Sequence, residues 1–165
     1  MSINRFLRHV CSGTRSVRKL FADADLAEIQ AAIEACERRH SGEIRFCIEH
    51  ALEPTELFKG VSARDRAEEL FCRLRVWDTE GNNGVLLYLL LADRAIEIVA
   101  DRGIHHFVGE VEWQRISSLI EESFKQGEFK SGIIKGLSEI ALVLERYFPP
   151  MAGDVDELPD GPVVL

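Results

Sequence analysis

An apolar run joined by a short polar connection to an alternating run most constrains the fold of this chain. Residues 85–91 read Val-Leu-Leu-Tyr-Leu-Leu-Leu and contain no charged side chain. After Ala92-Asp93-Arg94, apolar and other side chains alternate over residues 95–100. An unbroken apolar run indicates a strand that is covered on both faces, and a short connection joins neighbouring strands antiparallel. The segment predicts a central strand with a hairpin partner.

The segments before and after this hairpin predict the remaining layers. Residues 43–50 alternate between apolar and polar side chains, which indicates a half-buried strand. The helical pattern over 63–75 that separates this strand from the next predicts a right-handed parallel crossover. We therefore expect an α/β fold: a three-layer α/β/α sandwich on a small mixed sheet. Loops are expected over 51–61 and 104–109. Helices are expected over residues 25–39, 63–75, 110–125 and 130–147.

The chain is long enough for one domain, flanked by two segments of different composition. Residues 1–22 form a basic amphipathic segment, residues 23–148 the α/β domain, and residues 149–165 an acidic tail predicted to be disordered. The first 20 residues hold five basic side chains and no acid. Residues 1–21 could therefore contact an anionic membrane surface weakly. Alternatively, they pack on the acidic body of their own domain or on a partner.

Charge, cysteine content and hydropathy exclude several classes of protein. The net charge of −8 argues against nucleic-acid binding. The cysteines have no CxxC spacing and are expected to be reduced and mostly buried, as in a cytoplasmic protein. The longest apolar run has eight residues, whereas a membrane-spanning helix needs roughly 20. No secretory signal is recognisable. The cysteines are Cys11, Cys36, Cys47 and Cys72.

The order of the predicted elements and the amino-acid sequence of residues 81–104 resemble those of the TPM-domain family. Its founding members include a thylakoid-lumen phosphatase, a photosystem-associated protein and a nematode receptor modulator. The resemblance covers residues 23–148 and implies the α/β fold inferred above. It rests on Trp77, Asn83-Gly84, the strand 85–91, Asp93-Arg94, the strand 96–99, Gly103-Ile104, Phe124, Gly127-Glu128 and Gly132.

This chain departs from the family pattern at two corners. Trp77 is followed by Asp78-Thr79-Glu80 instead of a glycine turn. The second corner reads Ala100-Asp101-Arg102-Gly103 instead of the family's Gly-Tyr-Gly form. No signal peptide or membrane anchor of the kind that many members carry is recognisable in these residues, so the resemblance is expected to be to a cytosolic bacterial branch. The resemblance implies either an accessory role, divalent-metal binding or phosphatase activity.

Acidic and amide side chains gather at these two corners and predict a metal site. If the turn over 81–84 lies beside the corner at 101, several oxygen ligands converge, and Ca²⁺ and Mg²⁺ select such ligands. The alternative is that Asn and Asp serve the turns, because both tolerate left-handed backbone. The predicted ligands are Asp78, Glu80, Asn82, Asn83 and Asp101.

Basic side chains next to the second corner are candidates for binding phosphate. Arg102 offers the planar fork that matches phosphate oxygens, and His105 and His106 could bind phosphate or a transition metal. The alternative is an exposed histidine pair in a loop and an arginine that neutralises neighbouring acids.

Two functions are compatible with these residues. The first is an accessory module that binds a protein partner, with a divalent ion at the acidic loops. The second is a metal-assisted phosphomonoester hydrolase, in which the ion polarises phosphate and activates water. The absence of any recognised nucleophile or phosphate-loop motif favours the first.

Overall fold

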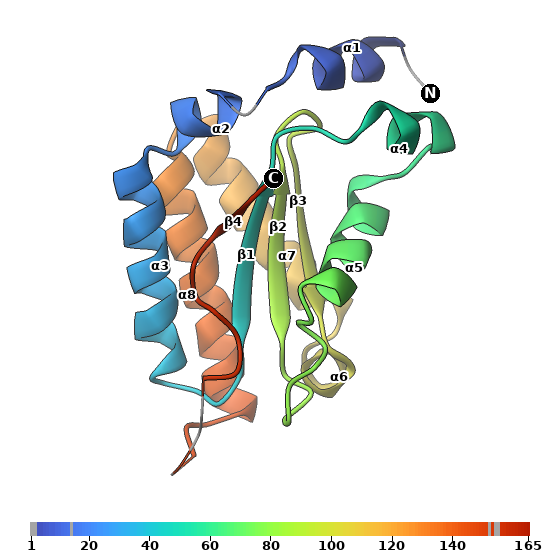
Figure 1. Ribbon diagram of the computed structural model, residues 1–165. Coiled ribbons are helices and arrows are strands. Elements are labelled where there is room, and N and C mark those ends of the chain that lie inside the picture. The colour runs from blue at the N-terminus through green and yellow to red at the C-terminus, as the bar shows by residue number, and fades with distance from the viewer. Residues whose placement is uncertain (1–2, 14, 152, 154–155) are drawn as a thin grey trace.

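A four-stranded mixed sheet forms the centre of the molecule in the computed structural model, which describes residues 3–13, 15–151, 153 and 156–165 (Figure 1). The strands lie in the order β3-β2-β1-β4. β1 is parallel to β2 and to β4, and β2 is antiparallel to β3. The predicted crossover and hairpin are therefore confirmed. The strands are β1 (Ile44–Glu49), β2 (Val85–Leu90), β3 (Ala95–Ala100) and β4 (Val163–Val164).

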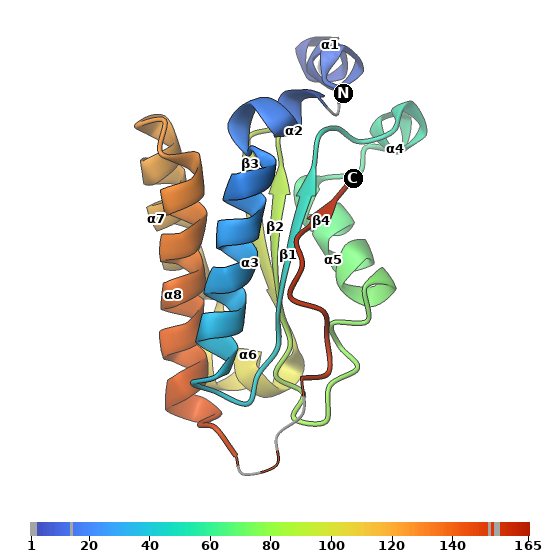
Figure 2. The same ribbon diagram turned by 60° about the vertical axis from the view of Figure 1, so that its left-hand side comes forward.

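Helices cover both faces of this sheet, which confirms the three-layer α/β/α sandwich (Figures 1 and 2). On one face, α3 (Asp23–Glu37), α7 (Glu110–Lys125) and α8 (Phe129–Tyr147) bury the larger apolar core. On the other face, α5 (Ala63–Arg73) covers a second core. All six residues of β2 are buried, as expected of a central strand. No helix among the described residues combines the length and apolar content that crossing a membrane requires.

β1 differs from the half-buried strand that its alternating pattern predicts, because all six of its residues are buried. The last residue of this strand, Glu49, lies against α5, where Arg66 donates two hydrogen bonds to its carboxylate, at 2.9 and 2.8 Å. The Tyr88 hydroxyl donates a third to the same carboxylate, at 2.7 Å. A buried charge is tolerated when it is paired and hydrogen-bonded, so the charge of Glu49 indicated pairing and not exposure.

The prediction of a disordered tail is wrong for residues 156–165. Val163 and Val164 form β4 on the edge of β1. Leu165 continues the pairing, because its N–H donates to the Ile48 carbonyl at 2.8 Å and its carbonyl accepts from the His50 N–H. Acidic and turn-forming residues dominate the composition of the tail. The closing apolar run nevertheless satisfies the backbone groups of β1, which would otherwise form an open edge.

Two segments predicted to be loops contain helices, and the basic N-terminal segment is also helical. The expected loop over 51–61 contains α4 (Pro54–Lys59), which begins at a proline and ends at left-handed Gly60. The expected irregular stretch 104–109 is the end of α6 (Arg102–Val108). The basic N-terminal segment divides into α1 (Ile3–Cys11) and α2 (Arg15–Leu20).

The cysteines and tryptophans differ in their exposure. Cys36 and Cys47 are buried, but Cys11 and Cys72 are exposed, so the expectation of mostly buried cysteines is correct for only two of the four. Trp113 is buried, whereas Trp77 is 50% exposed. Trp77 follows the end of α5 and lies outside both cores, where a helical apolar pattern no longer determines which side chains are buried.

Candidate functional site

The turn that precedes β2 and the corner that follows β3 lie against each other. The Asp101 N–H donates to the Gly84 carbonyl at 2.9 Å, and the Ile104 N–H donates to the Asn82 carbonyl at 3.3 Å. A Cβ added to Gly103 would lie 2.3 Å from that Asn82 carbonyl oxygen. We call residues 79–84 and 101–104 the loop junction. The antiparallel pairing of β2 and β3 creates it, because it brings the start of one strand beside the end of the other.

Asp101 and Asn83 are the two predicted ligands whose side chains are buried in the loop junction. They are 7% and 2% exposed. One Asp101 carboxylate oxygen caps α6 by accepting from the Arg102 N–H at 2.6 Å, and its Oδ2 is buried without a hydrogen-bond partner. The Asn83 amide donates to the Ser41 carbonyl at 2.7 Å, and its Oδ1 likewise has no partner within the described structure. Buried oxygens of this kind normally have a partner.

The remaining predicted ligands do not join these two. Asp78 is partly exposed and pairs with Arg75. The Glu80 side chain is exposed, and its N–H donates to the Glu157 carboxylate at 3.1 Å. Asn82 adopts a left-handed backbone with φ of 49°, as its role in the turn requires. Among the described residues, the carboxylates of Asp78, Glu80 and Asp101 do not form a group of three close enough to share an ion.

The predicted phosphate-binding side chains lie on α6. Arg102 and His106 are exposed, and His105 is half-buried. The side chains of neighbouring residues on a helix point about 100° apart, so His105 and His106 cannot both bind the same small ligand. The His106 ring instead contacts Phe107, with ring centroids 5.7 Å apart. Arg102 remains beside Asp101 in the first turn of the helix.

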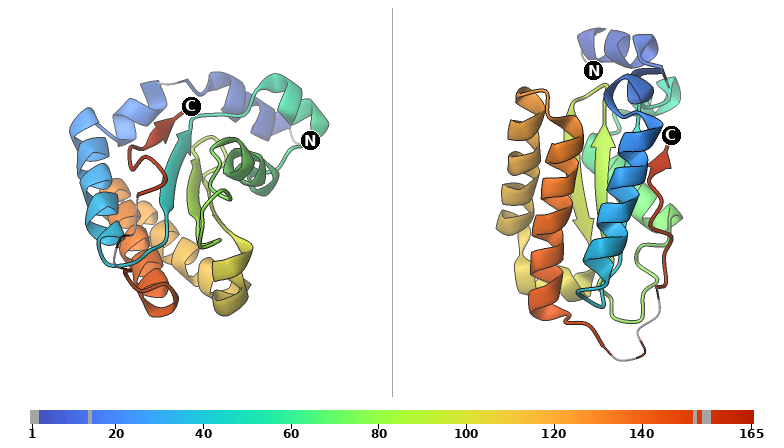
Figure 3. Two further views of the ribbon diagram at one scale, coloured as in Figure 1. Left: turned by 60° about the horizontal axis from the view of Figure 1, so that its bottom comes forward. Right: turned by 90° about the vertical axis from the view of Figure 1, so that its left-hand side faces the viewer.

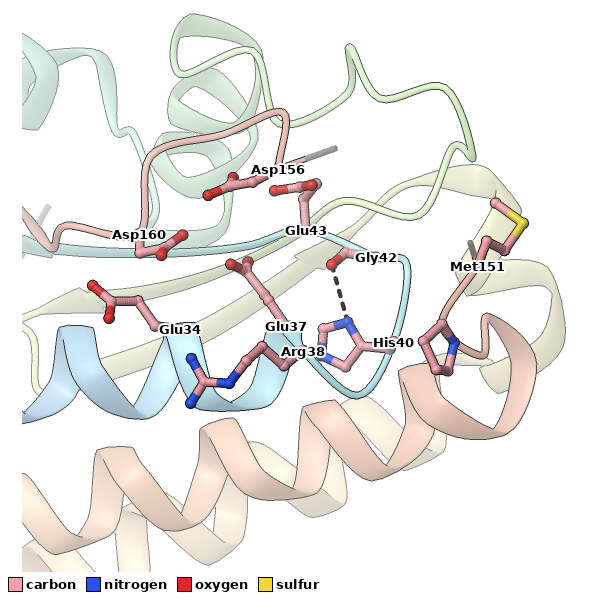
Figure 4. Close-up of a pocket in the computed structure, with 10 residues that line it drawn as sticks. Glu34, Glu37, Arg38, His40, Gly42, Glu43, Met151, Asp156 and Asp160 are labelled. Atoms are coloured by element: carbon pink, nitrogen blue, oxygen red, sulfur yellow. Dashed lines mark hydrogen bonds between the residues drawn. The ribbon is translucent and has the colours of Figure 1, made fainter. Parts of the chain in front are cut away.

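Sequence reasoning missed an acidic cluster at the same end of the sheet. One carboxylate oxygen each from Glu37, Asp156 and Asp160 lies within 4.8 Å of the others (Figure 4). Burial and the neighbouring Asp160 raise the pKa of Glu37 from its ordinary value to about 10. Burial and the neighbouring Asp160 also raise the pKa of Asp156. In this cluster the end of α3 contacts the tail, and no spacing of residues in the sequence predicts that contact.

Glu43 holds the tail beside this cluster. Its two carboxylate oxygens accept from the backbone N–H groups of Glu157 and Leu158, at 3.0 and 3.2 Å. Burial raises the pKa of Glu43 to about 7. Glu43 and His40 both line a cavity of about 400 Å³ (Figure 4). Burial lowers the pKa of His40 to about 4. The signal in the sequence was the charge of Glu43 itself, which precedes the first apolar residue of the alternating strand and shares its polar face with Arg45 and Glu49.

The loop junction and the acidic cluster both lie at the amino ends of the parallel strands β1 and β2 (Figure 1). Open parallel sheets usually bind ligands at the carboxyl ends of their strands. At those ends this molecule places α1, α4 and the connection between β2 and β3. A site at the acidic end therefore depends on the loops themselves and not on the general geometry of the parallel sheet.

These features define a small open α/β sandwich with polar loops at one end of its sheet. A family model described as the TPM domain matches residues 16–143. The chain therefore belongs to the TPM-domain family, which confirms the resemblance found in the sequence.

Two solved structures resemble this chain. The BA42 protein of the psychrophilic bacterium Bizionia argentinensis, determined by NMR, is 32% identical with a TM-score of 0.78, over 88% of this chain and 95% of that one. The N-terminal domain of a P. gingivalis protein is 19% identical with a TM-score of 0.60, over 81% of this chain and 83% of that one, and shares the fold. A comparison with curated proteins gives no match.

Proposed function

We propose that this TPM domain is an accessory binding module that takes up a divalent cation, Ca²⁺ or Mg²⁺, at the loop junction. One observation carries the proposal: Asp101 Oδ2 and Asn83 Oδ1 are both buried in the described structure without a hydrogen-bond partner. A buried polar atom without a partner costs about 1–3 kcal/mol. A cation or ordered water would remove that cost.

The donor atoms fit a hard cation. Ca²⁺ and Mg²⁺ bind carboxylate, amide and backbone carbonyl oxygens, and the loop junction holds no cysteine. Glu37, with a pKa of about 10, is neutral at neutral pH. The acidic side chains of Asp156 and Asp160 beside it, at the same end of the sheet, add the negative potential that favours cations over anions there. A bound ion would fix the two loops against each other, and the resulting surface is where we expect a protein partner to dock.

A titration with CaCl₂ and MgCl₂, followed by amide chemical shifts in ¹H–¹⁵N spectra, tests this proposal. We expect saturable shifts in residues 79–84 and 101–104. Asp101→Asn should weaken binding at least about tenfold, because it removes a charged ligand while an asparagine still caps α6. The matched control is Asp78→Asn, which removes an acid that is partly exposed and paired with Arg75 and should leave the affinity within about twofold.

Two results would contradict the assignment. Shifts confined to the cluster of Glu37, Asp156 and Asp160 would move the ion to the cavity shown in Figure 4. Unchanged spectra with both ions would remove the metal from the proposal and leave a protein-binding module alone.

A metal-assisted phosphatase is the second candidate function, and Arg102 is the observation that favours it. This side chain is exposed and follows Asp101 directly, so a phosphate oxygen could contact both the guanidinium and an ion at the loop junction. The assay is hydrolysis of p-nitrophenyl phosphate in the presence of the ion that binds more tightly. Turnover that Asp101→Asn and Arg102→Gln both abolish would establish the enzyme. Binding without turnover would exclude it.

A further inference from the structure

The basic N-terminal helix packs on its own domain by its polar side. Arg5 Nη2 lies 2.8 Å from Asp93 Oδ2, and His9 Nε2 lies 3.0 Å from Asp93 Oδ1. The Leu52 N–H donates to His9 Nδ1 at 3.0 Å. Burial alone would raise the pKa of Asp93, but the hydrogen bonds from Arg5 and His9 lower it overall. α1 is therefore fixed to the connection between β2 and β3 through charged groups.

The opposite side of α1 is apolar and faces solvent. Ile3, Leu7 and Val10 follow helical i, i+4 and i+3 spacing and are 76%, 53% and 56% exposed. Their neighbour Phe6 contacts Phe58 of α4, which is 72% exposed, with ring centroids 5.6 Å apart. We call Ile3, Leu7, Val10 and Phe58 the apolar patch. A surface helix of a globular domain normally directs its apolar stripe toward the core, and α1 does the reverse.

Exposed basic side chains lie on the elements that form this end of the molecule. On α1, α2, α4 and the connection between β2 and β3, five exposed side chains of the described structure are basic. One exposed acid, Glu53, precedes α4. On these elements, exposed basic side chains therefore outnumber exposed acidic ones in a chain whose net charge is −8, and the acidic loops lie at the other end. The basic side chains are Arg8, Arg18, Lys19, Lys59 and Arg94.

α1 is placed as an interfacial helix would be. It lies across the end of the sheet, at a large angle to the strands, and forms the outermost layer of that end (Figures 1 and 3). The TPM model begins at residue 16, so α1 lies outside the part of the chain that matches the family. Neither core contains Ile3, Leu7 or Val10. The packing of the domain therefore does not explain the apolar patch.

We propose that this end of the molecule binds the surface of an anionic lipid bilayer. α1 lies in the membrane plane, and the apolar patch enters the boundary between headgroups and acyl chains. Apolar insertion together with electrostatic attraction is what holds amphipathic helices at such interfaces. The charge distribution favours lipid over a second copy of this chain, because two basic ends would repel each other. The acidic loops then face away from the membrane.

Sedimentation of the full chain with vesicles tests the proposal. One vesicle type contains phosphatidylcholine alone, and the other contains phosphatidylcholine mixed with phosphatidylglycerol. We expect reversible binding to the anionic vesicles, much weaker binding to the neutral ones, and a loss of binding as salt rises. The triple variant Ile3→Ser, Leu7→Ser, Val10→Ser should bind the anionic vesicles at least about tenfold more weakly, because it removes the inserted side chains.

A matched control separates this surface from general surface hydrophobicity. The variant Val111→Ser, Leu142→Ser, Met151→Ser removes three apolar side chains of similar exposure, 82%, 53% and 65%, from other parts of the molecule. It should bind vesicles like the unmodified chain. Circular dichroism and urea unfolding should be unchanged in both variants, since the replaced side chains are exposed.

Three results would overturn the proposal. The first is no binding of the unmodified chain to anionic vesicles at low salt. The second is equal binding by the triple variant and the matched control. The third is a dimer in sedimentation velocity that the triple variant abolishes and that does not bind vesicles, because the apolar patch would then be an interface between two copies of this chain.

Discussion

Replacing Arg66 by leucine tests how the polar face of β1 is stabilised. The side chains of Arg66 and Glu49 are 9% and 5% exposed and form a bidentate ion pair. Arg66→Leu leaves the Glu49 carboxylate buried with the Tyr88 hydroxyl as its remaining side-chain donor. Breaking a buried ion pair by removing one partner costs about 3–5 kcal/mol. We therefore expect the free energy of unfolding to fall by about that amount.

Two further variants show how much of this loss comes from a single hydrogen bond and how much an exposed arginine on the same helix contributes. Tyr88→Phe removes one hydrogen bond to a charged group but leaves the ion pair, so the expected loss is about 1.5–3 kcal/mol. Arg64→Leu is the comparison on the same helix, because it removes an exposed ion pair with Glu68 and one hydrogen bond to the Ile98 carbonyl but leaves no buried charge unpaired. Exposed pairs contribute about 1 kcal/mol or less.

Urea unfolding followed by circular dichroism at neutral pH measures all three variants. A loss for Arg66→Leu no larger than that for Arg64→Leu would refute the argument, since it would mean that water or a rearranged side chain compensates Glu49. Recovery of stability in the double variant Glu49→Leu, Arg66→Leu would support it, because well-packed apolar residues often replace a buried ion pair at no net cost.

Three other predictions concern the acidic end, the loop junction and α1. The folded-state pKa of Glu37, about 10, lies above its ordinary value of 4.5, so its contribution to stability is present at low pH and is lost as pH rises between these values. Urea unfolding of Glu37→Gln should show a flatter decline over that range, and an unchanged slope would contradict the assignment. Gly103→Ala should destabilise by about 1–3 kcal/mol because its Cβ meets a backbone oxygen, whereas Gly13→Ala, with open space around it, should not in the same assay. Asp93→Asn should increase amide hydrogen exchange in α1, because it removes the charge that Arg5 contacts, and unchanged exchange would show that Asp93 does not fix the helix.

Which parts of the site could be predicted depends on how far apart in the sequence the contacting residues lie. The turn before β2 and the corner after β3 are joined by a hairpin, so local pairing rules were enough to place these two loops against each other. Glu37 meets Asp160 only because the tail returns to β1. Such a contact leaves no periodic pattern in the sequence. Glu43 carried a weak signal as a charged residue at the start of a strand, but its partners are backbone groups of the tail, whose acidic composition suggested disorder.

The sequence by itself determined the layers, the parallel crossover and the hairpin, because these follow from apolar periodicity and from the length of the connections. It also determined the family, through the motifs around residues 77–104. The tertiary structure decided which polar side chains are buried, how the tail completes the sheet and which way α1 faces. Periodicity records only which side chains share a face of an element. Whether that face meets core, another charged group or solvent depends on segments distant in the sequence, as the outward apolar patch of α1 shows.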